Sequence, residues 1–294
     1  MAHSRGIALI AVLWFVVLLS LIASAFLSVS RGSIRETDAA LAHARAEALA
    51  DSGIELAVLM LLEPAHREAL KTDGGARSIR LGGGEIAISI QDVAGRVDLN
   101  ESEPELLAAL FRSVGVPEER AQALAAAVAD WRDADNERQS GGAEAADYRR
   151  AGLGHVPANR PFYSVSELRQ VLGIDRTIFA GVAPSLTVYS GSPDVIASVA
   201  APPVLDALRQ SGAAIVTSEE IATSAMVPRF GITASGRASG GGAASLPPSD
   251  TDTYAIRAEA VLTGGGRFVR EAVVILTGDG RQPYVLQSWG TQGE

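Results

Sequence analysis

Cysteine is absent from this sequence of 294 residues, and Lys71 is its only lysine. Without cysteine the chain has no disulfide framework and no Cys-ligated zinc site. Acidic residues outnumber basic ones, 34 to 25, which gives a formal net charge of −9. A phosphate-binding surface needs clustered Lys and Arg, so this balance argues against non-specific binding of nucleic acid.

Motifs for catalysis are also missing. The sequence has no Gly-x-Ser-x-Gly elbow and no Gly-x-x-x-x-Gly-Lys loop. Its histidines are scattered, with no pair at the spacing of metal ligands on a helix: His3, His43, His66 and His155. We therefore expect no enzyme activity. The alternative is a signal-anchored periplasmic hydrolase, which would have to use the acidic residues between 130 and 147.

The most apolar stretch runs from Ile7 to Val29, 23 residues without a charge. As a helix it would be roughly 35 Å long, a little more than the roughly 30 Å hydrocarbon core of a bilayer. We expect it to cross a membrane. A cleaved signal peptide ending near Ala23-Ser24-Ala25 and a plain N-terminal anchor are the alternatives, although apolar residues continue beyond that site.

The leader Ser4-Arg5-Gly6 followed by Ile7 resembles the prepilin type, in which cleavage falls between Gly6 and Ile7 and leaves the helix on the mature chain. Pilin-like helices carry a Glu at the fifth mature position, where this chain has Ala11. A carboxylate in lipid needs a partner, such as the amine of a neighbouring subunit. The alanine at this position cannot form that pair. These features together resemble the K-type minor pseudopilin family of type II secretion.

The helix is expected to continue to about Glu63, because Pro64 cannot extend it. Alternating apolar residues then predict two strands, 78–81 and 85–91, joined by Gly82-Gly83-Gly84. Near the C-terminus similar alternation predicts three more strands, which should rejoin the first two: 254–262, 268–276 and 284–289. The expected fold class is α+β, a long transmembrane and amphipathic helix with a pilin-like antiparallel sheet, interrupted by a large all-α insertion.

The expected boundaries follow this order: leader 1–6, transmembrane helix 7–29, first pilin-like part 30–91, helical insertion 92–216, flexible loop region 217–250 and C-terminal strands 251–294. Within the insertion we expect helices at 103–114, 117–131, 166–172 and 176–180. Another helix should begin at Ser192-Pro193, and Pro202-Pro203 should break or re-cap it before 204–209.

The turn at Gly115-Val116 gives the insertion a helix-hairpin-helix-like shape as well as a sterile alpha motif-like one. A hairpin that grips DNA needs basic residues beside its exposed amides, whereas here Glu118 and Glu119 balance Arg112 and Arg120. A membrane-anchored DNA-uptake protein is therefore the alternative function. We favour the packed bundle.

Six carboxylates fall between Asp130 and Asp147, against two arginines. Such a loop after a helix could supply the six to eight oxygen ligands that Ca²⁺ takes, and a solvated acidic loop is the alternative. Asp133-x-Asp135 begins like an EF-hand loop, but the required Gly and terminal Glu do not follow.

The resemblance extends through this region in several ordered motifs: Asp130-Trp131-Arg132-Asp133-Ala134-Asp135, Gly142-Ala143-Glu144, Asp147-Tyr148, Pro157-Ala158-Asn159-Arg160-Pro161 and Ser166-Glu167-Leu168. In the K-type family such a segment is associated with bound calcium. The resemblance therefore implies calcium, with Asp133, Asp135, Glu144 and Asp147 as side-chain ligands.

The same resemblance implies a single-pass protein of the inner membrane with its bulk in the periplasm. It would cap the tip of the pseudopilus, help to start its assembly and bind the I- and J-type minor pseudopilins. The major pseudopilin and prepilin peptidase are further implied partners. Ala11, and an insertion too wide to stack inside a thin filament, both fit a place at the tip.

Overall fold

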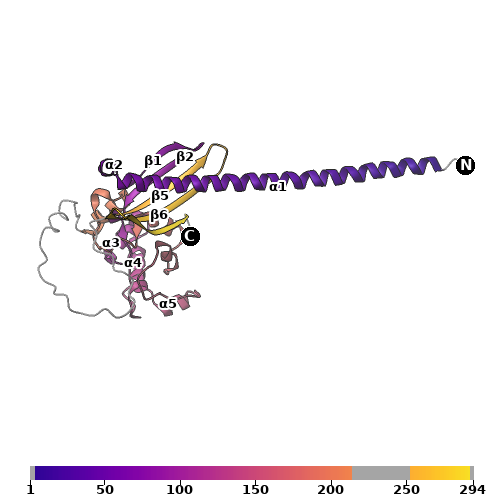
Figure 1. The fold of residues 1–294 in the computed structure, drawn as a ribbon. Helices are drawn as coiled ribbons and strands as arrows, with labels where there is room; N and C mark the ends of the chain where they lie inside the picture. Colours follow the sequence, from indigo (N-terminus) through magenta and orange to yellow (C-terminus); the bar gives the residue numbers. More distant parts are fainter. Residues whose placement is uncertain (1–3, 214–251, 292–294) are drawn as a thin grey trace.

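The structure, a computed structural model, describes residues 4–213 and 252–291. Its first element is a single helix, α1 (Ser4–Leu62), which extends as a rod well beyond the rest of the chain (Figure 1). Since α1 ends at Leu62, the predicted end near Glu63 is confirmed. Pro64 has no N–H to continue the helix and instead begins the short α2 (Pro64–Ala69). Within the described residues, no helix combines the length and hydropathy needed to cross a membrane. The span expected over 7–29 is therefore not confirmed.

A five-stranded antiparallel sheet lies against the C-terminal part of α1. Its strands, in the order β1-β2-β5-β6-β7, are β1 (Asp73–Leu81), β2 (Gly84–Asp92), β5 (Thr253–Leu262), β6 (Arg267–Asp279) and β7 (Gln282–Thr291). Gly82 and Gly83 form the first turn with φ of +60° and +80°, which glycine adopts without steric cost.

The apolar alternation predicted for the strands defines the buried face of the sheet. Ile86, Ile88 and Ile90 on β2 pack with one face of α1, including Ile54 and Leu61. Ala87 and Ser89 between them lie on the opposite face, as the period of two requires. In the described part of the chain, this is the smaller of two separate hydrophobic cores.

The prediction that the C-terminal strands rejoin the first hairpin is confirmed. β2 pairs directly with β5, with Ile90 opposite Ile256 and Asp92 opposite Tyr254. Everything between these strands is therefore inserted into one sheet.

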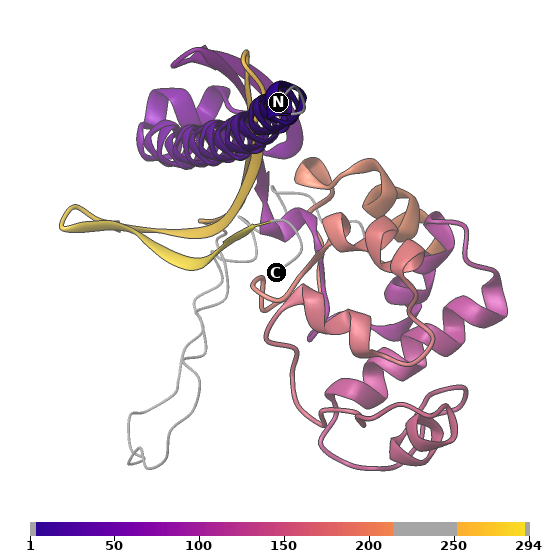
Figure 2. The same cartoon turned by 90° about the vertical axis from the view of Figure 1, so that its right-hand side faces the viewer.

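The inserted segment is mainly helical and lies apart from α1 (Figure 2). Its elements are α3 (Pro104–Ser113), α4 (Glu118–Arg132), α5 (Ala145–Arg150), α6 (Arg176–Val182), α7 (Pro202–Ser211), the 3-10 turns Val93–Gly95, Val165–Gln170, Ala183–Ser185 and Ala197–Val199, and the parallel pair β3 (Val97–Asp98) and β4 (Leu186–Thr187). These elements enclose the larger core.

Some predictions for the insertion need correction. No helix begins at Ser192-Pro193, where the chain is irregular up to the turn Ala197–Val199. The helix expected over 166–172 is a 3-10 segment. Of the two outcomes expected at Pro202-Pro203 the re-capping one is observed, because both prolines lie in the first turn of α7. The loop expected over 217–250 lies outside the described residues, and the sterile alpha motif-like label stays a prediction.

Candidate cation site

Three of the four predicted calcium ligands lie together after the end of α4. One carboxylate oxygen from each of Asp133, Asp135 and Glu144 lies within 4.8 Å of the other two. Asp133 directly follows the last residue of α4, and its N–H donates to Ala129 O at 3.0 Å. Asp135 Oδ1 accepts from Glu137 N at 2.7 Å, a local turn that fixes this exposed carboxylate.

The cluster contains carboxylate oxygens that are buried and unpartnered. Among the residues that the structure describes, none is a hydrogen-bond partner of Asp133 Oδ1, of Glu144 Oε1 or of Oδ2 of the fully buried Asp130. Burial raises the pKa of Asp133, and the charge of Asp135 raises it further. The pKa of Glu144 is raised by burial and by its acidic neighbours, with the N–H of Ala145 partly offsetting the rise. Unpaired buried carboxylates are costly, so this arrangement fits a bound cation.

The two arginines of the acidic segment do not neutralise these three groups. Arg132 donates to Leu99 O at 2.6 Å and to Ser102 O at 2.8 Å, which fixes α4 to the start of the insertion. Arg138 contacts Asp147 at 3.4 Å. Because the C-terminal end of a helix also carries partial negative charge, the position of Asp133 after α4 further favours a cation.

Asp147, the fourth predicted ligand, makes other contacts. It lies in the first turn of α5, where its Oδ2 accepts from Glu144 N at 3.1 Å, and Glu144 caps the same helix in return. Its Oδ1 contacts Arg150 at 2.8 Å. The hydrogen bond from Glu144 N, followed by the nearby arginines, lowers the pKa of Asp147. In this geometry Asp147 positions Glu144, and its role as a ligand stays a prediction.

Two residues important for this loop were not among the predicted site residues. Asp130 Oδ1 accepts from Gln139 N at 3.1 Å and so fixes the far side of the loop. Asn159 donates to Asp135 O at 2.5 Å. Asp130 was visible in the acidic segment, but neither its burial nor the contact of Asn159 follows from sequence spacing.

An aromatic group supports the loop from inside the insertion. Trp131, next to Asp130, stacks on Phe162 with ring centroids 6.0 Å apart, and Tyr148 lies 6.1 Å from Trp131. Tyr148 Oη accepts from Leu172 N at 2.9 Å, and burial raises the pKa of this tyrosine to about 12. The acidic loop is therefore anchored at both ends by buried aromatic side chains.

The predicted processing residues lie in the first turns of α1. Gly6 and Ile7 both have helical backbone in the uncleaved chain. Cleavage between them stays a prediction.

The turn considered for DNA binding has its arginines paired with acids. Gly115 has a φ of +89° between α3 and α4, as a tight helical turn requires. Arg112 contacts Glu118 at 2.5 Å, and Arg120 contacts Asp175 at 3.2 Å. Paired arginines are poorly placed to meet phosphates, which argues against the DNA-uptake alternative.

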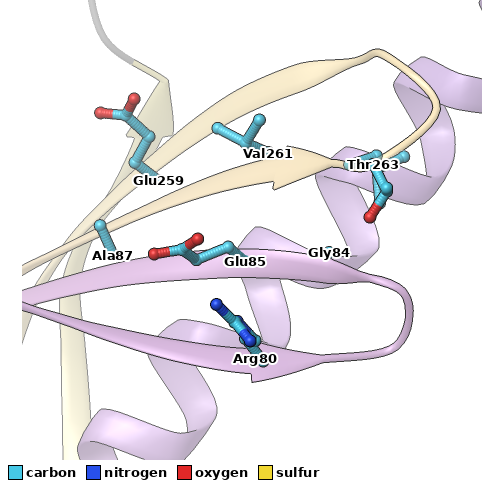
Figure 3. Close-up of a pocket in the computed structure, with 8 residues that line it drawn as sticks. Arg80, Gly84, Glu85, Ala87, Glu259, Val261 and Thr263 are labelled. Carbon is cyan, nitrogen blue, oxygen red and sulfur yellow. The ribbon is translucent and has the colours of Figure 1, made fainter.

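A shallow cavity of about 380 Å³ lies on the sheet face away from α1. Arg80, Glu85 and Glu259 from neighbouring strands β1, β2 and β5 border it (Figure 3). Its lining contains no histidine and no nucleophile next to a base. We therefore find no candidate active site in this cavity.

The fold defines a class of protein in which one long helix packs on an antiparallel sheet that a helical segment interrupts. Residues 89–191 match the family described as type II secretion system (T2SS), protein K. The chain is 29% identical over 205 residues to the type II secretion system protein K of Klebsiella pneumoniae, an alignment that covers 62% of each chain. It is 32% identical over 136 residues to the protein of that name from Pseudomonas aeruginosa, covering 43% of this chain and 40% of that one.

The fold is also similar to one chain in the crystal structure of the GspK-GspI-GspJ complex from the enterotoxigenic Escherichia coli Type 2 Secretion System. The TM-score is 0.50 at 17% identity, over 90% of this chain and 99% of that chain. The predicted resemblance to protein K of type II secretion is therefore confirmed. The alignment spans 62% of the length of the Klebsiella relative.

Proposed function

We propose that the protein is a minor pseudopilin of a type II secretion system, with a structural role and no catalytic one. The observation that carries this proposal is the layout of the fold. A long N-terminal helix packs on a sheet whose strands β2 and β5 enclose a helical insertion, and the protein K motifs lie in that insertion.

The proposal places the chain in the inner membrane through residues 7–29, with the sheet and the insertion in the periplasm. Its support is the uncharged sequence of this stretch. In addition, the large apolar side chains between Val12 and Ile22 in α1 are 45% to 70% exposed, so they need an apolar surrounding.

In the assembled pseudopilus we propose a place at the tip, together with I- and J-type minor pseudopilins, where the protein helps to start assembly. Ala11 offers no carboxylate to a subunit ahead of it. The insertion extends sideways from the α1 axis (Figure 2), which disfavours stacking within a thin filament.

Two measurements test this function. The mass of the mature N-terminus should correspond to a chain beginning at Ile7 when prepilin peptidase is active, and to the intact leader when it is not. The protein should also co-purify with the I- and J-type pseudopilins of the same organism. An intact leader in the presence of active peptidase, or no co-purification, would contradict the proposal.

We further propose that Asp133, Asp135 and Glu144 hold a calcium ion. The ion would pair with the unpartnered oxygens of Asp133 and Glu144 and offset the mutual repulsion of the three carboxylates. All three ligands are hard oxygens, which calcium prefers, and the chain has no cysteine to favour a softer metal.

Removal of calcium tests this site. Adding EDTA to the full-length chain should lower the melting temperature by at least about 5 °C, and excess calcium should restore it, since a ligand at 100 times its Kd contributes about 2.7 kcal/mol. An unchanged melting temperature would count against the site.

Matched variants locate the effect. Glu144→Gln should abolish the calcium-dependent part of the melting temperature, because an amide removes a charge from the cluster. Glu137→Gln lies in the same segment but outside the group of three, and it should retain the calcium response. If calcium raised the melting temperature of both variants equally, the ion would be bound elsewhere.

A further inference from the structure

Asn159 has an unusual backbone conformation. Its φ is +46°, and it is the only non-glycine residue with positive φ in the part of the chain that the structure describes. The left-handed region costs an L-residue roughly 1–2 kcal/mol, although Asn tolerates it better than most. Such a residue persists only where its surroundings hold it, and it often marks a functional site.

The contacts of Asn159 point to the cation loop. Its Nδ2 donates to Asp135 O at 2.5 Å and to Asn136 Oδ1 at 3.1 Å. Both acceptors belong to the segment between α4 and α5, more than 20 residues away in sequence. Asp135 is the exposed member of the carboxylate group, so little packing holds it apart from its local turn with Glu137 N.

The segment that carries Asn159 is itself firmly held. Arg160 contacts Glu167 at 3.1 Å, and its guanidinium lies 3.9 Å from the ring centroid of Tyr163. Two residues beyond Arg160, Phe162 donates its N–H to Asn100 Oδ1 at 2.7 Å and packs on Trp131. Asn159 therefore projects from a fixed support toward the loop.

We propose that Asn159 is a positioning residue of the cation site, which holds the backbone of Asp135 so that its carboxylate meets those of Asp133 and Glu144 before the ion binds. This inference rests on the proposed calcium site. The left-handed backbone turns the side-chain amide toward Asp135 O, and the hydrogen bond offsets the cost of that conformation. Without it, the ion would have to order the loop as it binds, which lowers affinity.

Asn159→Gly is the informative variant, because glycine adopts a φ of +46° without cost while losing both hydrogen bonds. Calcium binding to the full-length protein is measured by isothermal titration, and the melting temperature is measured in EDTA. We expect calcium affinity to fall about tenfold or more, as for other residues that orient metal ligands. The calcium-free melting temperature should change by no more than a few degrees, since backbone strain is relieved.

Asn136→Ala serves as the matched comparison. It removes the acceptor at 3.1 Å and leaves the bond to Asp135 O, so calcium affinity should fall less than threefold. If calcium affinity falls more in Asn136→Ala than in Asn159→Gly, the hydrogen bond to Asp135 O is not the one that positions the site.

The outcomes separate this inference from the calcium site itself. If the unaltered protein does not bind calcium, the calcium proposal fails and this inference fails with it. If it binds calcium and Asn159→Gly binds within twofold of it, only the positioning role is overturned. If Asn159→Gly melts much lower in EDTA and near-UV circular dichroism reports lost tertiary packing, Asn159 supports the fold in general and the positioning role is likewise overturned.

Discussion

Gly142 lies directly against the buried carboxylate of Asp130. A Cβ at Gly142 would come within 2.1 Å of Asp130 Oδ2, far closer than van der Waals contact allows. Asp130 cannot easily move away, because its Oδ1 accepts from Gln139 N and the side chain is fully buried. The absence of a side chain at residue 142 is therefore a requirement of the loop that carries Glu144.

Gly142→Ala should destabilise the protein by about 1–3 kcal/mol, the usual cost of overpacking a buried site. Thermal melting of the full-length chain measures the effect. Gly154→Ala is the control, because no described residue lies within 4 Å of its added Cβ, and it should stay within about 0.5 kcal/mol of the unaltered protein. Equal melting temperatures in the two variants would show that the loop yields at Gly142.

Asp175 gives the insertion a defined response to acid. This carboxylate caps α6, and its Oδ1 accepts from Ile178 N at 2.9 Å. That hydrogen bond first, then the N–H of Thr177 and Arg120, lowers the pKa of Asp175. The native pKa thus lies below the unfolded value, so the stabilisation is present above that value and is lost as pH falls through the native pKa.

Asp175→Asn should reduce the acid sensitivity of the insertion. Asn also caps helices well, so the variant keeps the cap and loses only the titrating charge. The difference in melting temperature between pH 7 and pH 3 should be smaller in the variant than in the unaltered protein. The same difference in both proteins would contradict the prediction.

At the scale of the elements, α1 lies close against the sheet at Gly53. An added Cβ there would lie 2.9 Å from both Ala258 Cβ on the central strand β5 and Ile86 Cγ2 on its neighbour β2. From sequence, Gly53 is only an interruption of a helix. In the structure, the missing side chain at Gly53 allows side chains of β2 and β5 to pack directly against the backbone of α1.

Gly53→Ala should destabilise the helix–sheet interface, although alanine favours a helix by about 1 kcal/mol over glycine. The collision with β2 and β5 costs about 1–3 kcal/mol, so the net effect should be a lower melting temperature. Ser52, one residue earlier in the same helix, is not part of the helix–sheet core, and its Oγ donates to Ala48 O within α1. Ser52→Ala should therefore melt near the unaltered protein. Stabilisation by Gly53→Ala would mean that the interface can separate without cost.

The sheet also contacts α1 through ion pairs. Arg270 on β6 is buried, and it contacts Asp51 at 2.6 Å and Glu47 at 2.7 Å, both on α1. Its guanidinium also lies over the rings of Phe268 and Trp289, at 4.8 and 5.1 Å. This arginine fixes the rotation of α1 on the sheet, since only one face of the helix carries the paired acids.

Elements with a strong local pattern were predictable from the sequence. The isoleucine alternation of β2 and the uninterrupted helix formers of α1 gave bounds within a few residues of those observed. The short α5 was missed, although Glu144 and Asp147 form a capping box at its start. The helix expected at Ser192-Pro193 was wrong, because proline at a first helical position permits a helix but does not require one.

For the candidate site, the sequence predicted the carboxylates, and the structure shows which of them converge. The oxygen-ligand chemistry of the site depends only on residue type, so it could be predicted from the sequence. The burial of Asp130 and the left-handed backbone of Asn159 depend on tertiary contacts more than on spacing, and no local pattern reveals them. The capping role of Asp147 is local, because Asp147 lies three residues after the N-cap Glu144.

At the scale of the whole molecule, the sheet and the insertion have separate cores. Asp92 at the end of β2 lies opposite Tyr254 near the start of β5. The entry and the exit of the inserted chain are thus neighbours, at a distance that an ordinary hairpin turn can bridge.

Replacement of residues 93–252 by a short Asn-Gly turn should therefore leave the helix–sheet part folded. We expect far-UV circular dichroism of the shortened chain to retain the strand signal and cooperative melting, and calcium to have no effect on its stability. Loss of cooperative melting would show that the sheet needs the insertion as a support.

The pairing of β2 with β5 also imposes a delay during synthesis. The two strands are neighbours in space but about 160 residues apart in the chain. At a translation rate of roughly 5–20 residues per second, β2 leaves the ribosome many seconds before its partner exists. During that interval the isoleucines of β2 and the facing side of α1 have no sheet to close over them, whereas the insertion is already complete. The nascent chain is therefore most exposed to aggregation, and most in need of a chaperone, while its last strands are still being made.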